Sequence, residues 1–207
     1  MTSSGSETKW EGYWRLNGFS ARILGWGRSL LGRQLCRYFE QKVPNGKASP
    51  TSLEAGCGSA IVSGMLANHG WHTVALDREA LPLRIARELS PRVQVVQGDL
   101  YRSCFHKDTF DLVWNNSTLE HLAEPLEALK EMAAAVRPGG FVFVGVPYTF
   151  GPLAVFKLKR RSFADTWDGT TYSCKDLVQL FERAGLQVLN HRLFFMGCFV
   201  GAIGRKP

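Results

Sequence analysis

The chain has 207 residues, and 25 Lys plus Arg against 18 Asp plus Glu give it a formal net charge of +7. Hydrophobic residues at 45% and charged residues at 21% are ordinary for a globular protein, which excludes extensive disorder and collagen-like or coiled-coil architectures. The length suits a single folded core, since domains commonly hold ~100–200 residues.

No feature of the sequence points to a membrane span or to secretion. Pro147, Gly151 and Pro152 interrupt the longest apolar run, so it falls short of the ~18 residues that a spanning helix needs. Residues 1–8 are polar and lack the apolar core of a signal peptide. The five cysteines are odd in number and show no C-x-x-C spacing, so we expect reduced thiols, no zinc site and a cytoplasmic location.

In chain order, residues 1–45 are expected to form an N-terminal tail and a helical cap. Residues 1–7 are rich in Ser, Thr and Gly, which is typical of a terminal tail. Leu31, Leu35 and Tyr38 recur at helical spacing and predict a helix over 28–41. A turn-rich stretch then leads into the main domain, which we expect to span residues 46–207.

Beyond Pro50, short apolar runs alternate with helical patterns, as they do in α/β proteins. The crossovers between the apolar runs are long enough for helices, so parallel pairing is expected. Residues 137–140 read Arg-Pro-Gly-Gly, which should stop the fourth helix and turn the chain into the fifth strand. The predicted strands are 52–55, 73–76, 93–96, 112–115 and 141–146, and the predicted helices between them are 60–68, 79–89 and 125–136.

The C-terminal part follows another pattern. Ser173 and Asp176 are spaced to cap a helix that ends at Gly185. Two strand-like stretches, 187–192 and 194–203, follow with too little chain between them for a crossover helix, so they should pair antiparallel. The predicted fold class is therefore α/β, a doubly wound, seven-stranded, mostly parallel sheet with an antiparallel C-terminal hairpin.

A glycine-rich turn follows the first predicted strand. Gly56 and Gly58 allow a sharp bend and let a ligand approach the backbone. Asp77 ends the next strand, 19 residues after Gly58, where a carboxylate can accept hydrogen bonds from a ribose diol. Asp99 ends the third strand. Together with Glu54, these acids would line one edge of the sheet and suit a ligand with an ammonium group, a diol and an exocyclic amine.

A dinucleotide is a competing ligand for this turn. Dinucleotide sites need a third small residue where this chain has Ile61, and Glu54 would repel a pyrophosphate. Both residues therefore disfavour a nicotinamide-dependent oxidoreductase, which stays as an alternative. A non-catalytic binding subunit with the same fold is a second alternative, because the sequence shows no unambiguous catalytic base.

With these motifs in order, the chain resembles the class I S-adenosylmethionine-dependent methyltransferases of the type 11 group, which have a Rossmann-like fold. The resemblance covers residues 52–147 most strongly, including the 54–60 turn, the 110–115 and 119–122 segments and the stretch from Leu129 to Gly140. Ala60 stands where many members have a third glycine, and we expect only a slight change in the loop. The implied ligand is S-adenosylmethionine, and no metal is implied.

The resemblance assigns the ribose to Asp77 and the adenine amine to Asp99, with Leu100 beside the ring. It implies in-line transfer of a methyl group, and alignment alone can contribute ~7–11 kcal/mol to such a step. Asp111 is expected to be structural because it precedes a strand, and Cys57 to be a small loop residue. The expected cofactor-binding residues are Glu54, Gly56, Gly58, Asp77, Arg78, Asp99, Leu100 and Asn115.

The acceptor side is less determined by the sequence. His121 follows the fourth strand and is either a general base or, the interpretation we favour, a structural residue at a helix start. Tyr13 and Trp14 either bind the ligands or anchor the N-terminal segment. The stretch 149–171 is expected to cover the acceptor, with Phe150, Phe156, Phe163 and Trp167 as contacts or as its core.

Basic residues cluster at two places, in the N-terminal helix and at Lys157, Lys159, Arg160 and Arg161. Such clusters are usually solvated, but they also raise the local concentration of anions. We therefore expect a small-molecule acceptor that is anionic or lipid-like, with peripheral contact to anionic lipid head groups. A nucleic-acid acceptor is disfavoured, since no RNA-binding module accompanies the modest net charge.

Overall fold

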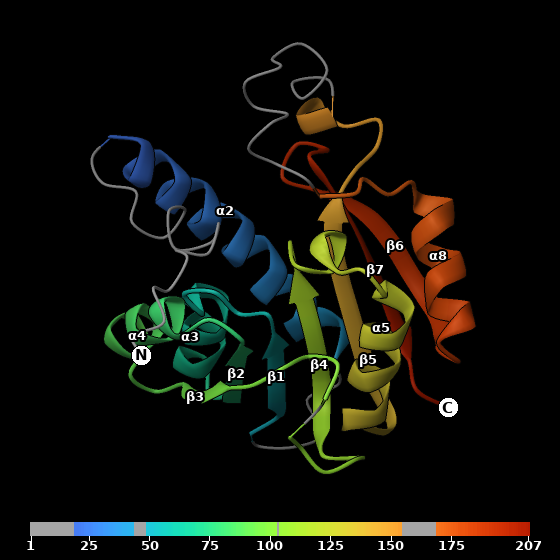
Figure 1. The fold of residues 1–207 in the computed structure, drawn as a ribbon, viewed down its shortest axis with the longest axis horizontal. Coiled ribbons are helices and arrows are strands. Elements are labelled where there is room, and N and C mark those ends of the chain that lie inside the picture. Colours follow the sequence, from blue (N-terminus) through green and yellow to red (C-terminus); the bar gives the residue numbers. More distant parts are fainter. Residues whose placement is uncertain (1–18, 44–48, 103, 155–168) are drawn as a thin grey trace, which may run out of the picture.

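The computed structural model describes residues 19–43, 49–102, 104–154 and 169–207. A seven-stranded sheet runs through it, with helices on both faces (Figure 1). In chain order the elements are α2 (Phe19–Lys42), β1 (Thr51–Ala55), α3 (Ile61–Asn68), β2 (His72–Asp77), α4 (Ala80–Leu89), β3 (Gln94–Gln97), β4 (Phe110–Asn116), η1 (Leu119–His121), α5 (Pro125–Ala135), β5 (Val136–Pro147), α8 (Cys174–Arg183), β6 (Gln187–Phe194) and β7 (Phe199–Arg205).

The strand order is β3-β2-β1-β4-β5-β7-β6, which confirms the predicted fold class. Strands β1 to β5 pair in parallel, whereas β7 runs antiparallel to both β5 and β6. The order reverses between β1 and β4, and in open sheets of this kind ligands bind at the carboxyl ends of the strands beside such a reversal.

The core is divided by the sheet into two sides. Trp114 and Phe143 face α2, where they pack against Phe39. Val113 and Val142 face the other way, into a cluster with residues of α5 and α8. Because successive side chains of a strand point to opposite faces, strands that are buried on both faces read as continuous apolar runs. Figure 1 shows α2, α3 and α4 on one side and α5 and α8 on the other.

Asp111 ties β1, β4 and β5 together at the amino-terminal end of the sheet. Its carboxylate accepts hydrogen bonds from the backbone N–H and the hydroxyl of Thr51, both at 2.9 Å. It also pairs with the Arg137 guanidinium at 2.5 Å, and its side chain is 3% exposed. The expectation that Asp111 is structural is therefore confirmed.

The predicted helix in the C-terminal part of the chain, α8, also forms, with Ser173 as its N-terminal cap. The Ser173 hydroxyl accepts from the Asp176 N–H, and the Asp176 carboxylate accepts from the Ser173 N–H. These hydrogen bonds hold the pKa of the Asp176 carboxyl below its usual value. Gly185 follows the helix with a φ of 79°, which a glycine adopts without strain.

Two details of the prediction were wrong. The second C-terminal strand begins at Phe199 and not at Phe194, because Phe195 and Met196 turn the chain with φ values of 47° and 53°. The Arg-Pro-Gly-Gly stretch lies inside β5, opposite a register shift in β4, rather than before the strand.

Candidate functional site

The glycine-rich turn leaves β1 and folds back over the end of β2. The N–H groups of Gly56 and Cys57 both donate to the carbonyl of Leu76, at 2.8 and 2.9 Å. Gly56 has a φ of 74°, and a Cβ there would lie 2.5 Å from the Thr118 side chain. The turn therefore requires glycine at this position for both conformation and space.

Ala60 occupies the position of the third glycine and keeps a glycine-like conformation. Its φ is 51°, its side chain is fully buried, and it precedes α3 directly. A left-handed conformation costs a non-glycine residue roughly 1–2 kcal/mol. The loop thus keeps its turn at the expense of local strain, which the surrounding packing offsets.

Asp77 connects the glycine turn to the start of α4. One carboxylate oxygen accepts from the Gly58 N–H at 2.8 Å, and the other accepts from the Glu79 N–H at 3.0 Å. Asp77 is partly exposed, and an ionised carboxylate has about four acceptor sites. Acceptor capacity is therefore left for a ligand hydroxyl beside the turn.

Asp99 and Arg78 lie at the same edge but are more open. Asp99 is exposed and accepts a hydrogen bond from the Tyr101 N–H at 2.9 Å. The side chain of Arg78 is 72% exposed, with its Nε 3.4 Å from a Glu79 carboxylate oxygen. Both side chains can therefore reorient toward a bound ligand at little cost.

Glu54 faces α3 beneath the glycine turn. Its carboxylate accepts from the Ser63 hydroxyl at 2.5 Å and from the Ser63 N–H at 3.3 Å. Burial raises the pKa of Glu54 to about 8, although the two hydrogen bonds from Ser63 oppose this shift. The structure therefore shows Glu54 as a support of the turn, and its contact with a ligand ammonium stays a prediction.

Asn115 and Leu100 also lie inside the molecule. The Asn115 amide donates to the carbonyl of Ala55 at 2.5 Å and accepts from the Leu119 N–H at 3.1 Å, so it joins the end of β1 to η1. Leu100 packs into the core on the α5 side, where it lines a small cavity with Leu53 and Met132. Their predicted ligand contacts stay predictions.

His121 ends η1, beside a buried carboxyl group that the sequence analysis missed. Its Nε2 lies 3.9 Å from Oε1 of Glu120, and the two side chains are 13% and 1% exposed. Burial raises the pKa of Glu120 to about 8. The Glu120 carbonyl accepts from the Thr170 N–H at 2.9 Å, so η1 is also fixed to the chain that returns toward α8. An acid and a histidine between two leucines, in residues 119–122, were the available signal.

Several predicted residues lie outside the described ranges: Tyr13, Trp14, Phe156, Phe163, Trp167 and the four basic residues at 157–161. At the two described ends of the 149–171 stretch, the hydroxyls of Thr149 and Thr171 lie 3.2 Å apart. Burial raises the pKa of the Cys57 thiol, in keeping with a loop residue rather than a nucleophile. In the ranges that the structure covers, no three His, Cys, Asp or Glu residues are arranged to hold a metal ion.

Residues 53–144 match the family model described as "Methyltransferase domain". This match spans the glycine turn, Asp77, Asp99 and η1. Residues 53–144 therefore form a methyltransferase domain, and the sheet has the fold of the S-adenosylmethionine-dependent methyltransferases. The seven-stranded sheet and its strand order agree with this assignment.

Relatives with curated names share this methyltransferase domain. A ubiquinone biosynthesis O-methyltransferase of Aliivibrio fischeri is 33% identical over 104 residues, which cover 48% of this chain and 44% of the relative. One of Vibrio cholerae is 31% identical over 155 residues, covering 69% and 63%. The chain thus spans less than half of the first of these relatives.

A solved structure shows the same fold. The magnesium protoporphyrin IX methyltransferase of Synechocystis PCC 6803, with bound S-adenosylhomocysteine, superposes with a TM-score of 0.73 at 13% identity, covering 96% of this chain and 93% of that one. At this identity the likeness concerns the fold alone.

The buried Glu120 carboxyl makes a prediction about stability against pH. Because its folded-state pKa of about 8 lies above the ordinary value of 4.5, the folded chain binds the extra proton between these values. The free energy of unfolding should therefore fall as the pH rises from about 4.5 to about 8. Glu120→Gln, which cannot ionise, should reduce this fall, as measured by urea unfolding at several pH values.

Glu54 contributes a slope of the same sign, so the variant should keep part of the pH dependence. Asp108→Asn, an exposed substitution, is the matched control and should leave the slope unchanged. An equal slope in wild type and Glu120→Gln would show that Glu120 is ionised in the folded chain.

Proposed function

We propose that this chain transfers the methyl group of S-adenosylmethionine to a small-molecule acceptor. The observation that supports it is the Asp77 carboxylate, which accepts a hydrogen bond from the Gly58 N–H and keeps acceptor capacity beside a turn in which Gly56 and Gly58 have no side chains. Such a site fits a nucleoside that brings two hydroxyl donors close to the backbone. The S-adenosylmethionine sulfonium supplies an electrophilic methyl group, so the protein has to align the acceptor rather than activate the donor.

Residues at the carboxyl ends of several strands share the binding of S-adenosylmethionine in this proposal. Asp77 holds the ribose hydroxyls, and Asp99, at the end of β3, accepts from the adenine amine. Gly56 and Gly58 let the ligand lie against the backbone. Arg78, Leu100 and Asn115 complete the neighbourhood, and Glu54 acts on the ligand ammonium either directly or through the turn that it supports.

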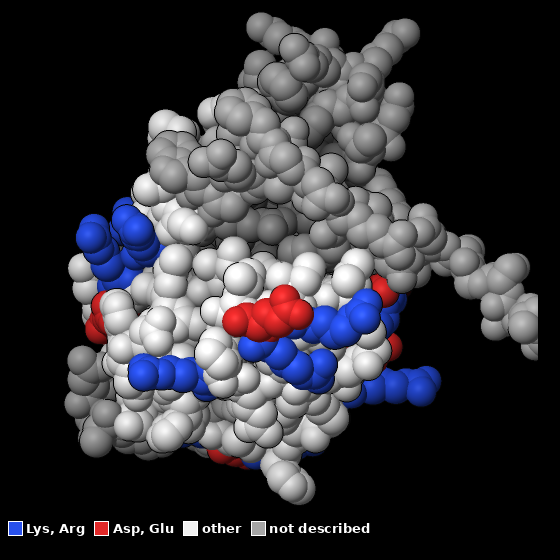
Figure 2. All heavy atoms as spheres, turned by 90° about the vertical axis from the view of Figure 1, so that its left-hand side faces the viewer, with Lys and Arg blue, Asp and Glu red and all other residues white. Residues whose placement is uncertain are grey.

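The acceptor is proposed to be lipid-like or anionic. Two relatives named above act in ubiquinone biosynthesis, although the chain matches only part of each. Exposed Arg33 and Arg37 on α2 supply positive charge at the surface. Figure 2 shows that Lys and Arg predominate over Asp and Glu on the described surface of the flank it presents.

Two other functions are weighed against this one. An NAD-dependent oxidoreductase is disfavoured because Ile61 starts α3 where a small residue would have to admit the pyrophosphate. A non-catalytic subunit would keep the same turn and the same Asp77 contacts, so cofactor turnover, and not binding, separates it from an enzyme.

Asp77→Asn should weaken the binding of S-adenosylhomocysteine by ~10-fold or more, because a charged acceptor of ribose hydrogen bonds becomes a neutral amide. Isothermal titration calorimetry measures the effect. Asp108→Asn is the matched control, since Asp108 is exposed, pairs with Lys206 and lies at the opposite end of the sheet. Tight binding of NAD by the wild type, with no binding of S-adenosylhomocysteine, would overturn the proposal.

The alternative role of His121, as a general base rather than the structural residue that we favour, has a kinetic signature. His121→Ala should lower kcat by ~100-fold or more if the imidazole removes the acceptor proton, and the affinity for S-adenosylhomocysteine should stay near the wild-type value. The assay follows transfer of a labelled methyl group to a candidate acceptor. Near-normal turnover would instead assign His121 to the support of η1.

A further inference from the structure

Exposed apolar side chains gather at one corner of the molecule. The described residues include five large hydrophobic side chains that are exposed, and three of them lie at the carboxyl ends of β5 and β6 or in the loops that follow: Phe150, Leu193 and Met196. Met196 is 84% exposed and Phe150 is 74% exposed, while Leu189 and Leu193 on β6 are 47% and 43% exposed. Leu189, near the start of β6, and Leu89, on α4, lie elsewhere.

The two most exposed side chains belong to loops that touch. A Cβ on Gly151, beside Phe150, would lie 2.3 Å from the carbonyl of Gly197, beside Met196. A Cβ on Gly197 would in turn contact Leu193 at 3.9 Å. Leu193, Met196 and Phe150 therefore lie on neighbouring segments of the chain, and we call these three exposed residues the apolar corner.

The turn at this corner contains two non-glycine residues in the left-handed backbone conformation. Phe195 and Met196 both have positive φ, which costs roughly 1–2 kcal/mol for each non-glycine residue. The Phe195 N–H donates to the Gln34 side chain of α2 at 3.0 Å, and the Tyr148 N–H donates to the Cys198 carbonyl at 3.0 Å. These bonds fix a turn that presents Met196 to solvent, and strain of this kind is typical of functional sites.

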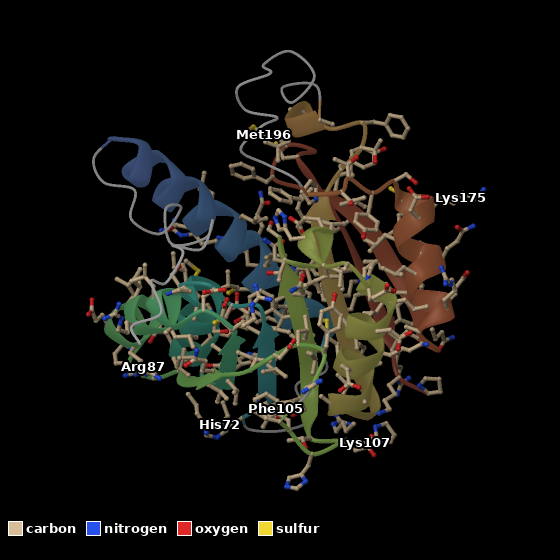
Figure 3. All side chains as sticks on the ribbon, in the orientation of Figure 1. His72, Arg87, Phe105, Lys107, Lys175 and Met196 are labelled. Atoms are coloured by element: carbon tan, nitrogen blue, oxygen red, sulfur yellow. The ribbon has the colours of Figure 1, made fainter. Side chains whose placement is uncertain are left out.

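The corner lies at the same edge of the sheet as the methyltransferase site. Both β5 and β6 run antiparallel to β7, so β6 ends where the parallel strands end. Figure 3 shows Met196 at the end of the molecule toward which β5 points, whereas Lys107 lies at the opposite end. The corner and Asp77 therefore lie at the same edge of the sheet, although β6 and β2 are five strand positions apart.

The charge around the corner is positive. Residues 148–154 and 187–205 contain no Asp or Glu, and the exposed side chain of Arg192 lies over the rings of Tyr38 and Phe194. Arg33 and Arg37 are exposed on α2 on either side of Gln34, which binds the turn. Apolar side chains that protrude among cations match a surface with anionic head groups over an apolar interior.

We propose that the apolar corner docks on an anionic lipid bilayer, with Met196 and Phe150 entering the interface and Arg33, Arg37 and Arg192 facing the head groups. This deepens the proposed function and rests on it, because docking would bring the methyl-transfer site to an acceptor that resides in the membrane. None of the described helices is long and apolar enough to cross the bilayer, so the contact is peripheral.

The test is co-sedimentation of the full chain with vesicles, without added cofactor. Binding is expected to phosphatidylcholine vesicles that contain phosphatidylglycerol, to weaken as NaCl is raised, and to be much weaker with phosphatidylcholine alone. The double variant Phe150→Ser with Met196→Asn should bind at least ~10-fold more weakly. Asparagine is chosen at 196 because it tolerates positive φ, so the turn should form.

Two further variants sharpen the comparison. Leu89→Gln removes an exposed apolar side chain far from the corner and should bind as the wild type does. Arg33→Gln should weaken binding to the anionic vesicles by about fivefold, the effect of one cation near such a surface. Melting temperatures of all variants should stay near the wild-type value, because each changed side chain is exposed.

Equal vesicle binding by the wild type and the double variant would overturn the proposal. It would also be overturned if the wild type ignored the vesicles and sedimented as a dimer that the double variant loses, since the corner would then be covered by a second copy. Calorimetry with S-adenosylhomocysteine separates the two proposals. A wild-type chain that binds S-adenosylhomocysteine but not the vesicles counts against docking alone. A wild-type chain that binds the vesicles but not S-adenosylhomocysteine counts against the proposed function.

Discussion

The site depends on the hydrogen bond between the Gly58 N–H and the Asp77 carboxylate. This bond, together with the two N–H groups that donate to the Leu76 carbonyl, fastens the turn after β1 to the end of β2. The turn therefore takes its shape from a neighbouring strand, and Asp77 serves both the turn and the proposed ribose. A ligand that binds Asp77 would also stabilise the loop that cradles it.

Two buried carboxyl groups lie on either side of that turn, and burial raises the pKa of both to about 8. Glu54 lies beneath it, against Ser63, and Glu120 lies beyond β4, beside His121. Thr118 joins the two regions, because its hydroxyl donates to the Gly56 carbonyl at 3.0 Å. Through Thr118 and η1, the cofactor turn is connected to the Thr170 backbone and hence to the described end of the expected acceptor cover. These contacts link the glycine turn, η1 and the chain at Thr170 in one network.

Most of the sheet was predictable because strands buried on both faces read as uninterrupted apolar runs, and the glycine turn was recognisable from its spacing to Asp77. The same rule misplaced the start of β7, since residues 194–203 read as one apolar run. The structure instead turns at Phe195 and Met196, which have positive φ, and the Phe195 N–H donates to the Gln34 side chain. Glu54 was located at the correct strand end, but the direction of its side chain toward Ser63 depends on the packing of α3. Glu120 was missed because its burial depends on residues 169–172, distant in sequence.

The most direct measurement of the central claim is a crystal structure of the chain soaked with S-adenosylhomocysteine. The account predicts the nucleoside at the carboxyl ends of β1 to β3, with its ribose hydroxyls on the Asp77 carboxylate, its adenine amine near Asp99, and the 56–58 turn unchanged. Crystals that show no ligand there at saturating concentration, or carboxylates turned away from a bound ligand, would contradict it.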